Sequence, residues 1–270
     1  MPAAIAFNGE IRRYLLYVPR HRLGGEPLPL VLMFHGGASH PRGIARVSGM
    51  HYIAEREGFI VAYPAGIPGR WGLTWNPGGA DVNSPGGDVG FARALVDELR
   101  RRYEIDPRRV YAAGMSVGGV LVYRLACTMS NRFAAIAVVA GTMATENCRP
   151  SLPVSVLHIH GTADQRVPLR GGRGRMTARH NNWPPVADGI SRWCEINRCG
   201  QPGQVVRLID GLVGHRYTGD GDVELWLVEG GRHVWPGSPA RAWWWWKRAP
   251  TAGFCASEKV WQFFAEHARA

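Results

Sequence analysis

Lysine is almost absent from this chain of 270 residues. Lys247 and Lys259 are the only two among its 32 basic residues, and the other 30 are arginines. With 21 acidic residues the net charge is +11, which indicates nucleic-acid binding when the basic residues form a stripe. Here the arginines are scattered along the chain, so we expect no nucleic-acid partner.

Long apolar runs and a cysteine framework are also missing. Uncharged apolar stretches such as Phe133 to Thr145 fall short of the roughly 18 residues that a membrane-spanning helix needs, so we expect no membrane span. Five cysteines are too few for a disulfide scaffold at this length, and none stands in a zinc-ligand pattern. Met1 to Phe7 does not resemble a secretory leader, because no basic segment precedes an apolar one. This leaves a cytoplasmic location open.

What the chain does contain is an alternation of short apolar runs and longer helical patterns. We expect strands at 11–18, 30–34, 59–63, 109–113, 134–140, 154–160, 205–209 and 223–228, and helices at 47–57, 88–102, 118–129, 186–197 and 257–267. Such alternation indicates an α/β protein with a mostly parallel sheet and helices on both faces. The Gly- and Pro-rich stretch 65–87 is expected to be a long functional loop. No linker divides residues 1–270, so we expect a single domain.

A serine between a strand and a helix is the first candidate for chemistry. Gly114 to Gly118 fits G-x-S-x-G, after an expected strand that ends at Ala113. This context is typical of a nucleophile elbow, a strained turn that needs small residues two positions before and after the serine. We therefore expect Ser116 to be a catalytic nucleophile; the alternative is an ordinary glycine-rich turn.

A serine hydroxyl needs a base, and the base needs an acid that fixes its tautomer. In this kind of fold the chain order is serine, acid, histidine. Asp164 follows the strand that ends at His160, and His233 lies in a glycine-rich loop after the strand 223–228. We expect Asp164 to orient His233. The alternatives are a turn-forming role for Asp164 and His215 as the base, in a connection between two late strands.

Two backbone amides are needed to hold the oxyanion of a tetrahedral intermediate. One is expected from Val117, the residue after the nucleophile. The other should come from the loop after the strand 30–34, which reads His35-Gly-Gly-Ala38 and is similar to the HGGG loop of lipases and esterases. The Gly37 amide is favoured, with Ala38 as the alternative.

Further motifs extend this pattern over nearly the whole chain. They are Phe34-His-Gly-Gly37, Thr74-Trp-Asn76, Asp88-Val-Gly-Phe91, Asp106-Pro-Arg-Arg-Val110, Gly114-Met-Ser-Val-Gly-Gly119, Tyr123-Arg-Leu-Ala-Cys127, Phe133-Ala-Ala-Ile-Ala137, His160-Gly-Thr-Ala-Asp164 and Gly230-Gly-Arg-His-Val-Trp-Pro-Gly237. As a set they resemble the esterases grouped around polyhydroxybutyrate depolymerases, feruloyl esterases and acetylxylan esterases, often called carbohydrate esterase family one. The resemblance implies an α/β-hydrolase fold, an extracellular location, no metal and no organic cofactor. It implies the same triad of Ser116, Asp164 and His233.

The resemblance also bears on the cysteines. It implies a disulfide between Cys127 and Cys148. Cys199 would usually find its partner near residue 217, where this chain has no cysteine, which puts a second disulfide in doubt. Cys194 and Cys199 are five residues apart and either pair with each other or stay free, and the state of Cys255 is open.

Aromatic residues are the candidates for the substrate cleft. They are Trp75, with its neighbour Asn76 on the 65–87 loop, and Trp235, two residues after the expected base. Exposed aromatic side chains there would bind a ring or an apolar chain, whereas the alternative is simple packing. Four consecutive tryptophans, Trp243 to Trp246, are either an aromatic platform or a helix or lid packed on the domain.

Together these features predict a serine esterase that forms an acyl-enzyme. The expected substrates are 3-hydroxybutyrate oligomers or polyesters; the alternative is feruloyl or acetyl esters on plant polysaccharide. From a different class, the alternative is a hydrolase-fold protein that binds a ligand without turnover. We expect an ester substrate as the partner, while the oligomeric state stays open.

Overall fold

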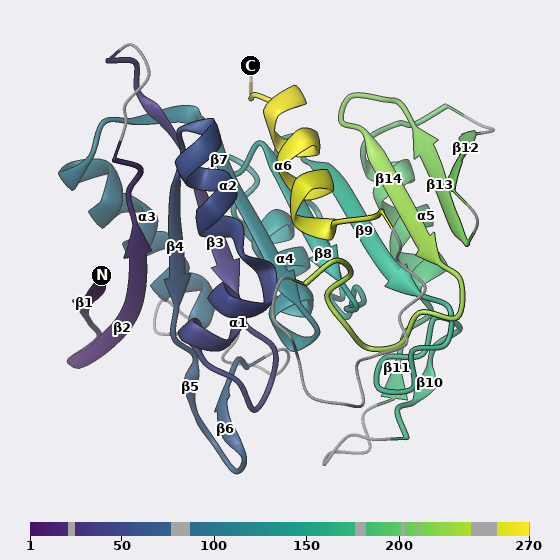
Figure 1. Cartoon of the computed structure of the whole chain (residues 1–270), viewed down its shortest axis with the longest axis horizontal. Coiled ribbons are helices and arrows are strands. Elements are labelled where there is room, and N and C mark those ends of the chain that lie inside the picture. Colours follow the sequence, from purple (N-terminus) through teal and green to yellow (C-terminus); the bar gives the residue numbers. More distant parts are fainter. Residues whose placement is uncertain are drawn as a thin grey trace.

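A ten-stranded sheet forms the centre of the molecule in a computed structural model, which describes residues 1–20, 25–76, 87–175, 182–200, 203–209, 211–238 and 253–269 (Figure 1). Across the sheet the strands are β1 (Pro2–Phe7), β2 (Glu10–Tyr17), β4 (Ile60–Pro64), β3 (Leu28–Phe34), β7 (Ile105–Met115), β8 (Ala135–Val139), β9 (Ser155–Gly161), β14 (Val223–Val228), β13 (Leu212–Tyr217) and β12 (Gln204–Ile209). The six central strands, β4 to β14, are parallel, and the two strands at either edge pair antiparallel. The predicted mostly parallel sheet is confirmed.

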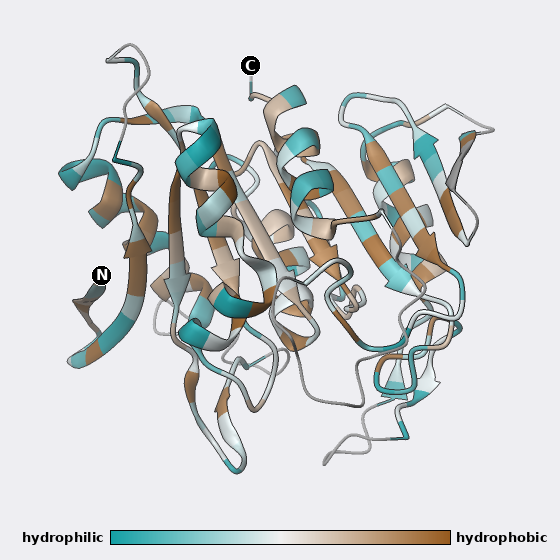
Figure 2. Cartoon of the chain, viewed as in Figure 1, coloured by the Kyte–Doolittle hydropathy of each residue, from teal (hydrophilic) through white to brown (hydrophobic). Residues whose placement is uncertain are grey.

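Helices cover both faces of the sheet. α1 (Pro41–Ser48), α2 (Met50–Glu57) and α6 (Ala256–Glu266) pack on one face, and α3 (Asp88–Arg102), α4 (Val117–Thr128) and α5 (Val186–Ile196) pack on the other. Because side chains alternate along a strand, Leu30 and Leu32 of β3 enter the core with α3 to α5, while Val31 and Met33 enter the core with α1, α2 and α6. Figure 2 shows the apolar residues gathered along these central strands.

Three predicted elements need correction. The single helix expected at 47–57 is replaced by two helices. The backbone of Gly49 has the left-handed conformation (φ 60°), and its amide donates to Ala45 O, so α1 ends there. The connection expected between the strands at 205–209 and 223–228 contains β13, so His215 lies in a strand and pairs with Val205 and Leu225. The stretch 65–87, expected to be a loop, contains a hairpin of β5 (Ile67–Gly69) and β6 (Gly72–Thr74). Elsewhere, β10 (Gly172–Arg173) pairs antiparallel with β11 (Asn182–Trp183).

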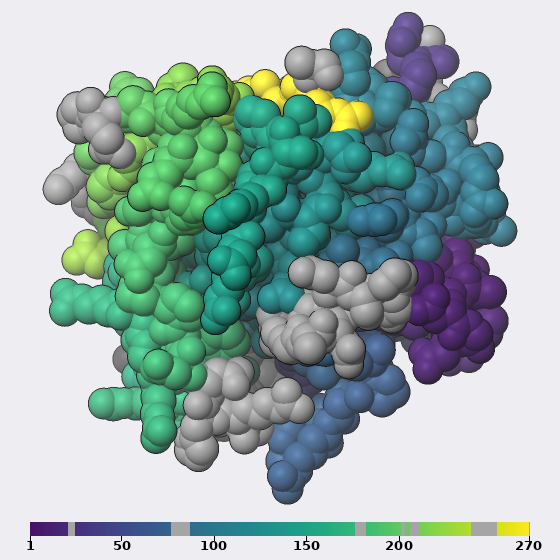
Figure 3. All heavy atoms as spheres, turned by 180° about the vertical axis from the view of Figure 1, so that it is seen from behind, coloured from purple at the N-terminus to yellow at the C-terminus, as the bar shows by residue number. Residues whose placement is uncertain are grey.

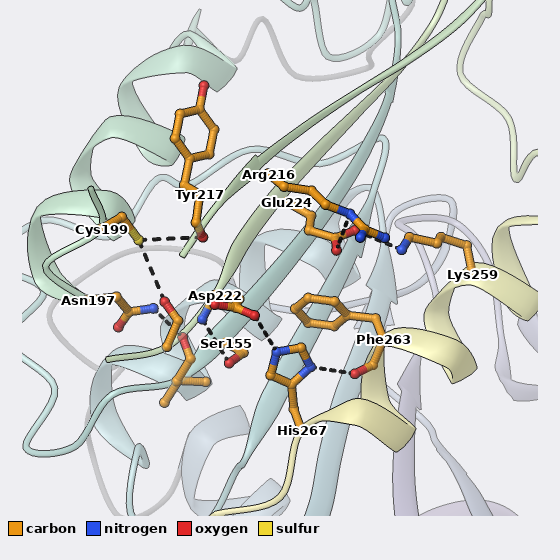
Figure 4. A network of polar contacts seen from close by, with 12 residues as sticks. Ser155, Asn197, Cys199, Arg216, Tyr217, Asp222, Glu224, Lys259, Phe263 and His267 are labelled. Carbon is orange, nitrogen blue, oxygen red and sulfur yellow. Dashed lines mark hydrogen bonds and ion pairs between the residues drawn. The ribbon is translucent and has the colours of Figure 1, made fainter. Parts of the chain in front are cut away.

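Polar contacts hold α6 against the strands at one side of the sheet (Figure 4). Lys259 Nζ lies 2.8 Å from Glu224 Oε2 of β14, and both side chains are buried. His267 Nε2, just after α6, lies 3.2 Å from Asp222 Oδ2, just before β14. These contacts fix α6 to the strand whose following loop carries His233.

The cysteines divide into one bridge and three thiols. Cys127, in the last turn of α4, forms a disulfide with Cys148, as the sequence resemblance implied. Cys194, Cys199 and Cys255 are free. In the described part of the chain, no helix is both long enough and apolar enough to cross a membrane.

Candidate active site

Ser116 occupies the sharp turn from β7 into α4. Its backbone has φ 56° and ψ −124°, a strained conformation for a residue with a side chain. The turn closes only because its neighbours are small: a Cβ on Gly114 would lie 2.5 Å from Gly118 O, and one on Gly118 would lie 2.4 Å from His35 O. This steric requirement is the physical content of the G-x-S-x-G motif.

The loop after β3 packs directly against this turn. A Cβ on Gly36 would lie 3.3 Å from Ser116 Cβ, and one on Gly37 would lie 3.4 Å from Val117 Cγ2. The Val117 amide belongs to the first turn of α4, where amides lack an intrahelical acceptor. No described residue accepts a hydrogen bond from the Gly37 amide. The two amides expected from the sequence thus belong to the two segments that meet at Ser116.

Asp164 and His233 are directly hydrogen-bonded. His233 Nδ1 lies 2.7 Å from Asp164 Oδ2, while Asp164 Oδ1 accepts the backbone amides of Arg166 and Val167 at 2.8 and 3.0 Å. Burial by itself raises the pKa of Asp164, but the hydrogen bond and charge of His233 and the Val167 amide together hold this pKa below its ordinary value of 3.8. The carboxylate is therefore ionised at neutral pH. It selects the His233 tautomer with a proton on Nδ1, which leaves Nε2 available as a base.

Sheet order brings the three candidates to one edge. Ser116 follows β7, the Asp164 loop follows β9 and the His233 loop follows β14, and these strands are parallel members of the run β7-β8-β9-β14. The Asp164 and His233 loops touch, because a Cβ on Gly161 would lie 2.2 Å from Gly231 O. Among the described residues no hydrogen bond joins Ser116 Oγ to His233. Catalytic hydrogen bonds of this kind are often long until substrate binds.

Trp75 and Trp235, the aromatic candidates for the substrate cleft, are buried, at 1% and 2% exposed. This burial fits the alternative of simple packing. Trp75 Nε1 donates to His35 O at 2.7 Å, and Trp235 Nε1 donates to Ser257 Oγ at 2.9 Å. Both indoles are buried because the body of the ring packs in the core while the N–H finds a partner. Trp75 thus anchors the loop after β3, and Trp235 anchors the loop that carries His233.

The other sequence candidates fall in different places. Asn76 is exposed, and its backbone amide donates to Asp88 Oδ2 at 2.8 Å. His215, the alternative base, makes no hydrogen bond to Asp164. Trp243 to Trp246 lie outside the described residues. In the described part of the chain, no group of three or more His, Cys, Asp or Glu side chains is arranged to hold a metal.

An exposed aromatic residue near the site was missed from the sequence. Trp71, at the turn of the β5–β6 hairpin, is 63% exposed, and the Arg70 guanidinium lies 5.0 Å from its ring centroid. The hairpin projects from the body of the molecule, as Figure 3 also shows from behind. Its β6 strand touches the loop after β3, because a Cβ on Gly72 would lie 3.2 Å from Ala38 C and Leu73 pairs with Ser39. The turn sequence Pro68-Gly-Arg-Trp-Gly72 was the available signal.

Curated relatives share parts of this sequence. The putative esterase NocK of Nocardia uniformis subsp. tsuyamanensis is 38% identical over 178 residues, which are 64% of this chain and 50% of the relative. Feruloyl esterase B of Piromyces equi is 28% identical over 233 residues, which are 83% of this chain and 42% of the relative. The bifunctional acetylxylan esterase/xylanase XynS20E of Neocallimastix patriciarum is 32% identical over 157 residues, 58% of this chain and 22% of the relative. The chain thus spans half or less of these relatives.

Solved structures confirm the predicted α/β-hydrolase fold. An acetyl xylan esterase from Aspergillus awamori is similar over 98% of this chain and 99% of that chain, with a TM-score of 0.72 and 16% identity. A protein described as sOPH is similar over 100% of this chain and 88% of that chain, with a TM-score of 0.65 and 13% identity. At such identities the likeness establishes the fold alone. The family model described as esterase PHB depolymerase matches residues 12–167, more than half of the chain, and the protein therefore belongs to this family.

Proposed function

We propose that this protein is a serine esterase that hydrolyses carboxylic esters through an acyl-enzyme. Ser116 is the nucleophile, His233 is the base and then the acid, and Asp164 orients His233. The observation that carries this proposal is the 2.7 Å hydrogen bond between His233 and Asp164, formed at the sheet edge where the strained Ser116 turn lies. Membership of the esterase PHB depolymerase family supports it.

The chemistry proceeds in two symmetrical halves. Ser116 Oγ attacks the ester carbonyl carbon, and its proton passes to His233 Nε2. The C–O bond to the alcohol then breaks, and His233 returns the proton to the departing alkoxide. In the second half a water molecule takes the place of the serine, and the acid is released as Ser116 recovers its proton.

Two electrostatic features lower the barrier in this scheme. The Gly37 and Val117 amides donate to the oxyanion, and the positive end of the α4 dipole adds to the field at the same point. The ionised Asp164 stabilises the imidazolium that forms on His233. Its two backbone donors keep it fixed during the transfer.

The substrates that we propose first are 3-hydroxybutyrate oligomers or polyesters, as the family description suggests. One observation favours a second class, the aryl esters: the indole of Trp71 is exposed on the hairpin whose β6 strand touches the loop after β3, and an aromatic ring of that kind offers a stacking surface. The names of two relatives, a feruloyl esterase and an acetylxylan esterase/xylanase, also support esters of plant polysaccharide.

We also propose that the chain acts as one catalytic domain in an extracellular location. The Cys127–Cys148 disulfide supports this location, because disulfides persist in oxidising compartments. The proposed partner is the ester substrate, without a metal or an organic cofactor.

The test compares release of 3-hydroxybutyrate from a short oligomer with release of ferulate from methyl ferulate. Ser116→Ala should lower both rates by at least about 1,000-fold and abolish labelling by a fluorophosphonate. Ser191→Ala, at an exposed position of α5, is the matched control and should change neither. Turnover that survives in Ser116→Ala would exclude the mechanism, whereas a protein that neither turns over esters nor reacts with the fluorophosphonate would be a non-catalytic binding protein.

A further inference from the structure

A chain of three hydrogen bonds runs through buried side chains beneath the Asp164 loop. Tyr123 Oη of α4 lies 2.7 Å from His158 Nδ1, and His158 Nε2 lies 3.1 Å from His160 Nδ1, both histidines on β9. His160 Nε2 lies 2.8 Å from Val167 O. The three side chains are at most 1% exposed, so water does not offer them alternative partners.

The chemistry of the last acceptor sets the direction of every bond in the chain. Val167 O can only accept, so His160 carries a proton on Nε2. Burial lowers the pKa of both histidines, so each ring is neutral and has one donor and one acceptor. His160 Nδ1 therefore accepts from His158 Nε2, and His158 Nδ1 accepts from the Tyr123 hydroxyl. Each ring nitrogen has one partner, and reversal would leave Val167 O facing a lone pair.

Val167 connects this chain to the acid. Its carbonyl accepts from His160, while its own amide donates to Asp164 Oδ1 at 3.0 Å. His160 Nε2 also lies 3.7 Å from Asp164 Oδ2, the oxygen that accepts from His233. A single residue is thus held by His160 on one side and holds Asp164 on the other.

We propose that His160 is a positioning residue for the esterase reaction, which fixes Val167 and thereby aims Asp164 at His233, with Tyr123 and His158 holding its ring. The inference rests on the proposed function, because that function makes Asp164 the acid of the triad. A neutral ring at this place also has a purpose: a second cation beside Asp164 would compete with His233 for the carboxylate.

The groups that face Asp164 come from three segments. His160 faces it from β9, His233 faces it from the loop after β14, and the amides of Arg166 and Val167 face it from its own loop. His233 is the one of these groups whose protonation changes in the reaction.

The test uses two substitutions of His160 with 4-nitrophenyl butyrate as substrate. His160→Leu removes the donor to Val167 O, whereas the amide of His160→Gln can replace it. Because a misplacement of about 1 Å can cost about 100-fold in rate, we expect His160→Leu to lower kcat by about 10- to 100-fold with little change in KM. His160→Gln should restore most of kcat.

A purely structural role would lower thermal stability in both variants and leave kcat per folded molecule unchanged, and that result would overturn the proposal. Nitrogen NMR of the wild-type histidines provides a measurement that does not depend on the variants folding. His158 and His160 should both be neutral with the proton on Nε2 at neutral pH, and a His160 that is charged there, or that carries its proton on Nδ1, would also overturn the proposal. Wild-type turnover that does not depend on Ser116 would instead reject the proposed function.

Discussion

The Cys127–Cys148 disulfide should make a measurable contribution to stability through the unfolded chain. The two residues are 21 positions apart, and the loop that they close contains the whole of the central strand β8. For a loop of about 22 residues, the chain-entropy model gives a loss of about 11 cal/mol/K in the unfolded state, or about 3.4 kcal/mol at 25 °C. In a chain of this size, that free energy corresponds to a fall in Tm of roughly 6 °C when the bridge is removed.

Urea unfolding of the oxidised protein, the reduced protein and the Cys127→Ala/Cys148→Ala variant measures this contribution. The reduced wild type keeps the two buried sulfur atoms, so it separates the cross-link from the loss of packing. Cys255→Ala removes a free thiol and is the control. The slope of the unfolding free energy against urea concentration should be steeper without the bridge, because the unfolded chain is then more expanded and exposes more surface. A difference between oxidised and reduced protein below about 1 kcal/mol would refute the entropic reasoning.

Four further predictions follow from single contacts. Arg12→Met leaves the buried Asp88 without its partner at 3.0 Å and should lower the free energy of unfolding in urea by about 3–5 kcal/mol; a loss below about 1 kcal/mol would contradict this. Gly118→Ala forces α4 away from the end of β3 and should cost about 1–3 kcal/mol, with a loss of esterase activity in the fraction that still folds. The pKa of Asp164 is lowered in the folded protein, so its contribution to stability should be present above the ordinary pKa and be lost as pH falls through the lowered value. The difference in unfolding free energy between wild type and Asp164→Asn should therefore shrink in acid, and a difference that stays constant with pH would contradict this. Trp71→Ala should raise KM for methyl ferulate several-fold, which corresponds to a loss of up to about 1 kcal/mol of binding free energy, without changing Tm. An unchanged KM would show that Trp71 does not contact this substrate.

The Ser116 turn was predictable because its constraint is local. A strand, a strained turn and a helix follow one another directly, and the steric need for glycine at positions 114 and 118 appears in the sequence as a motif. The fold class was predictable for a similar reason, since short apolar runs alternate with helical patterns along the chain. Both conclusions depend on residues that are close together along the chain.

The exposure of the tryptophans was not predictable, because it depends on distant partners. Trp75 donates to a carbonyl 40 positions away, and Trp235 donates to Ser257, 22 positions away. Nothing in the sequence around either residue distinguishes it from Trp71, which is exposed. β13 was missed because Gly214 and two polar residues interrupt its apolar alternation, and its pairing with β12 and β14 compensates for this weak pattern.

The histidines of β9 show an intermediate case. His158 and His160 are two residues apart, so a strand must place them on the same face. The direction of their hydrogen bonds could be assigned only from the contacts with Tyr123 of α4 and Val167 of the Asp164 loop, which are distant in the sequence.

The anchor of the His233 loop has a consequence for biosynthesis. Trp235 donates to Ser257 Oγ, and the same hydroxyl donates to Ser48 O at 2.6 Å, a contact between residues 209 positions apart. During translation the early strands and the Ser116 turn leave the ribosome first and can fold as they appear, but the hydroxyl that ties down the His233 loop emerges only with α6. A nascent chain therefore displays the Ser116 turn before the His233 loop is secured, and the proposed triad can be complete only after α6 has been synthesised.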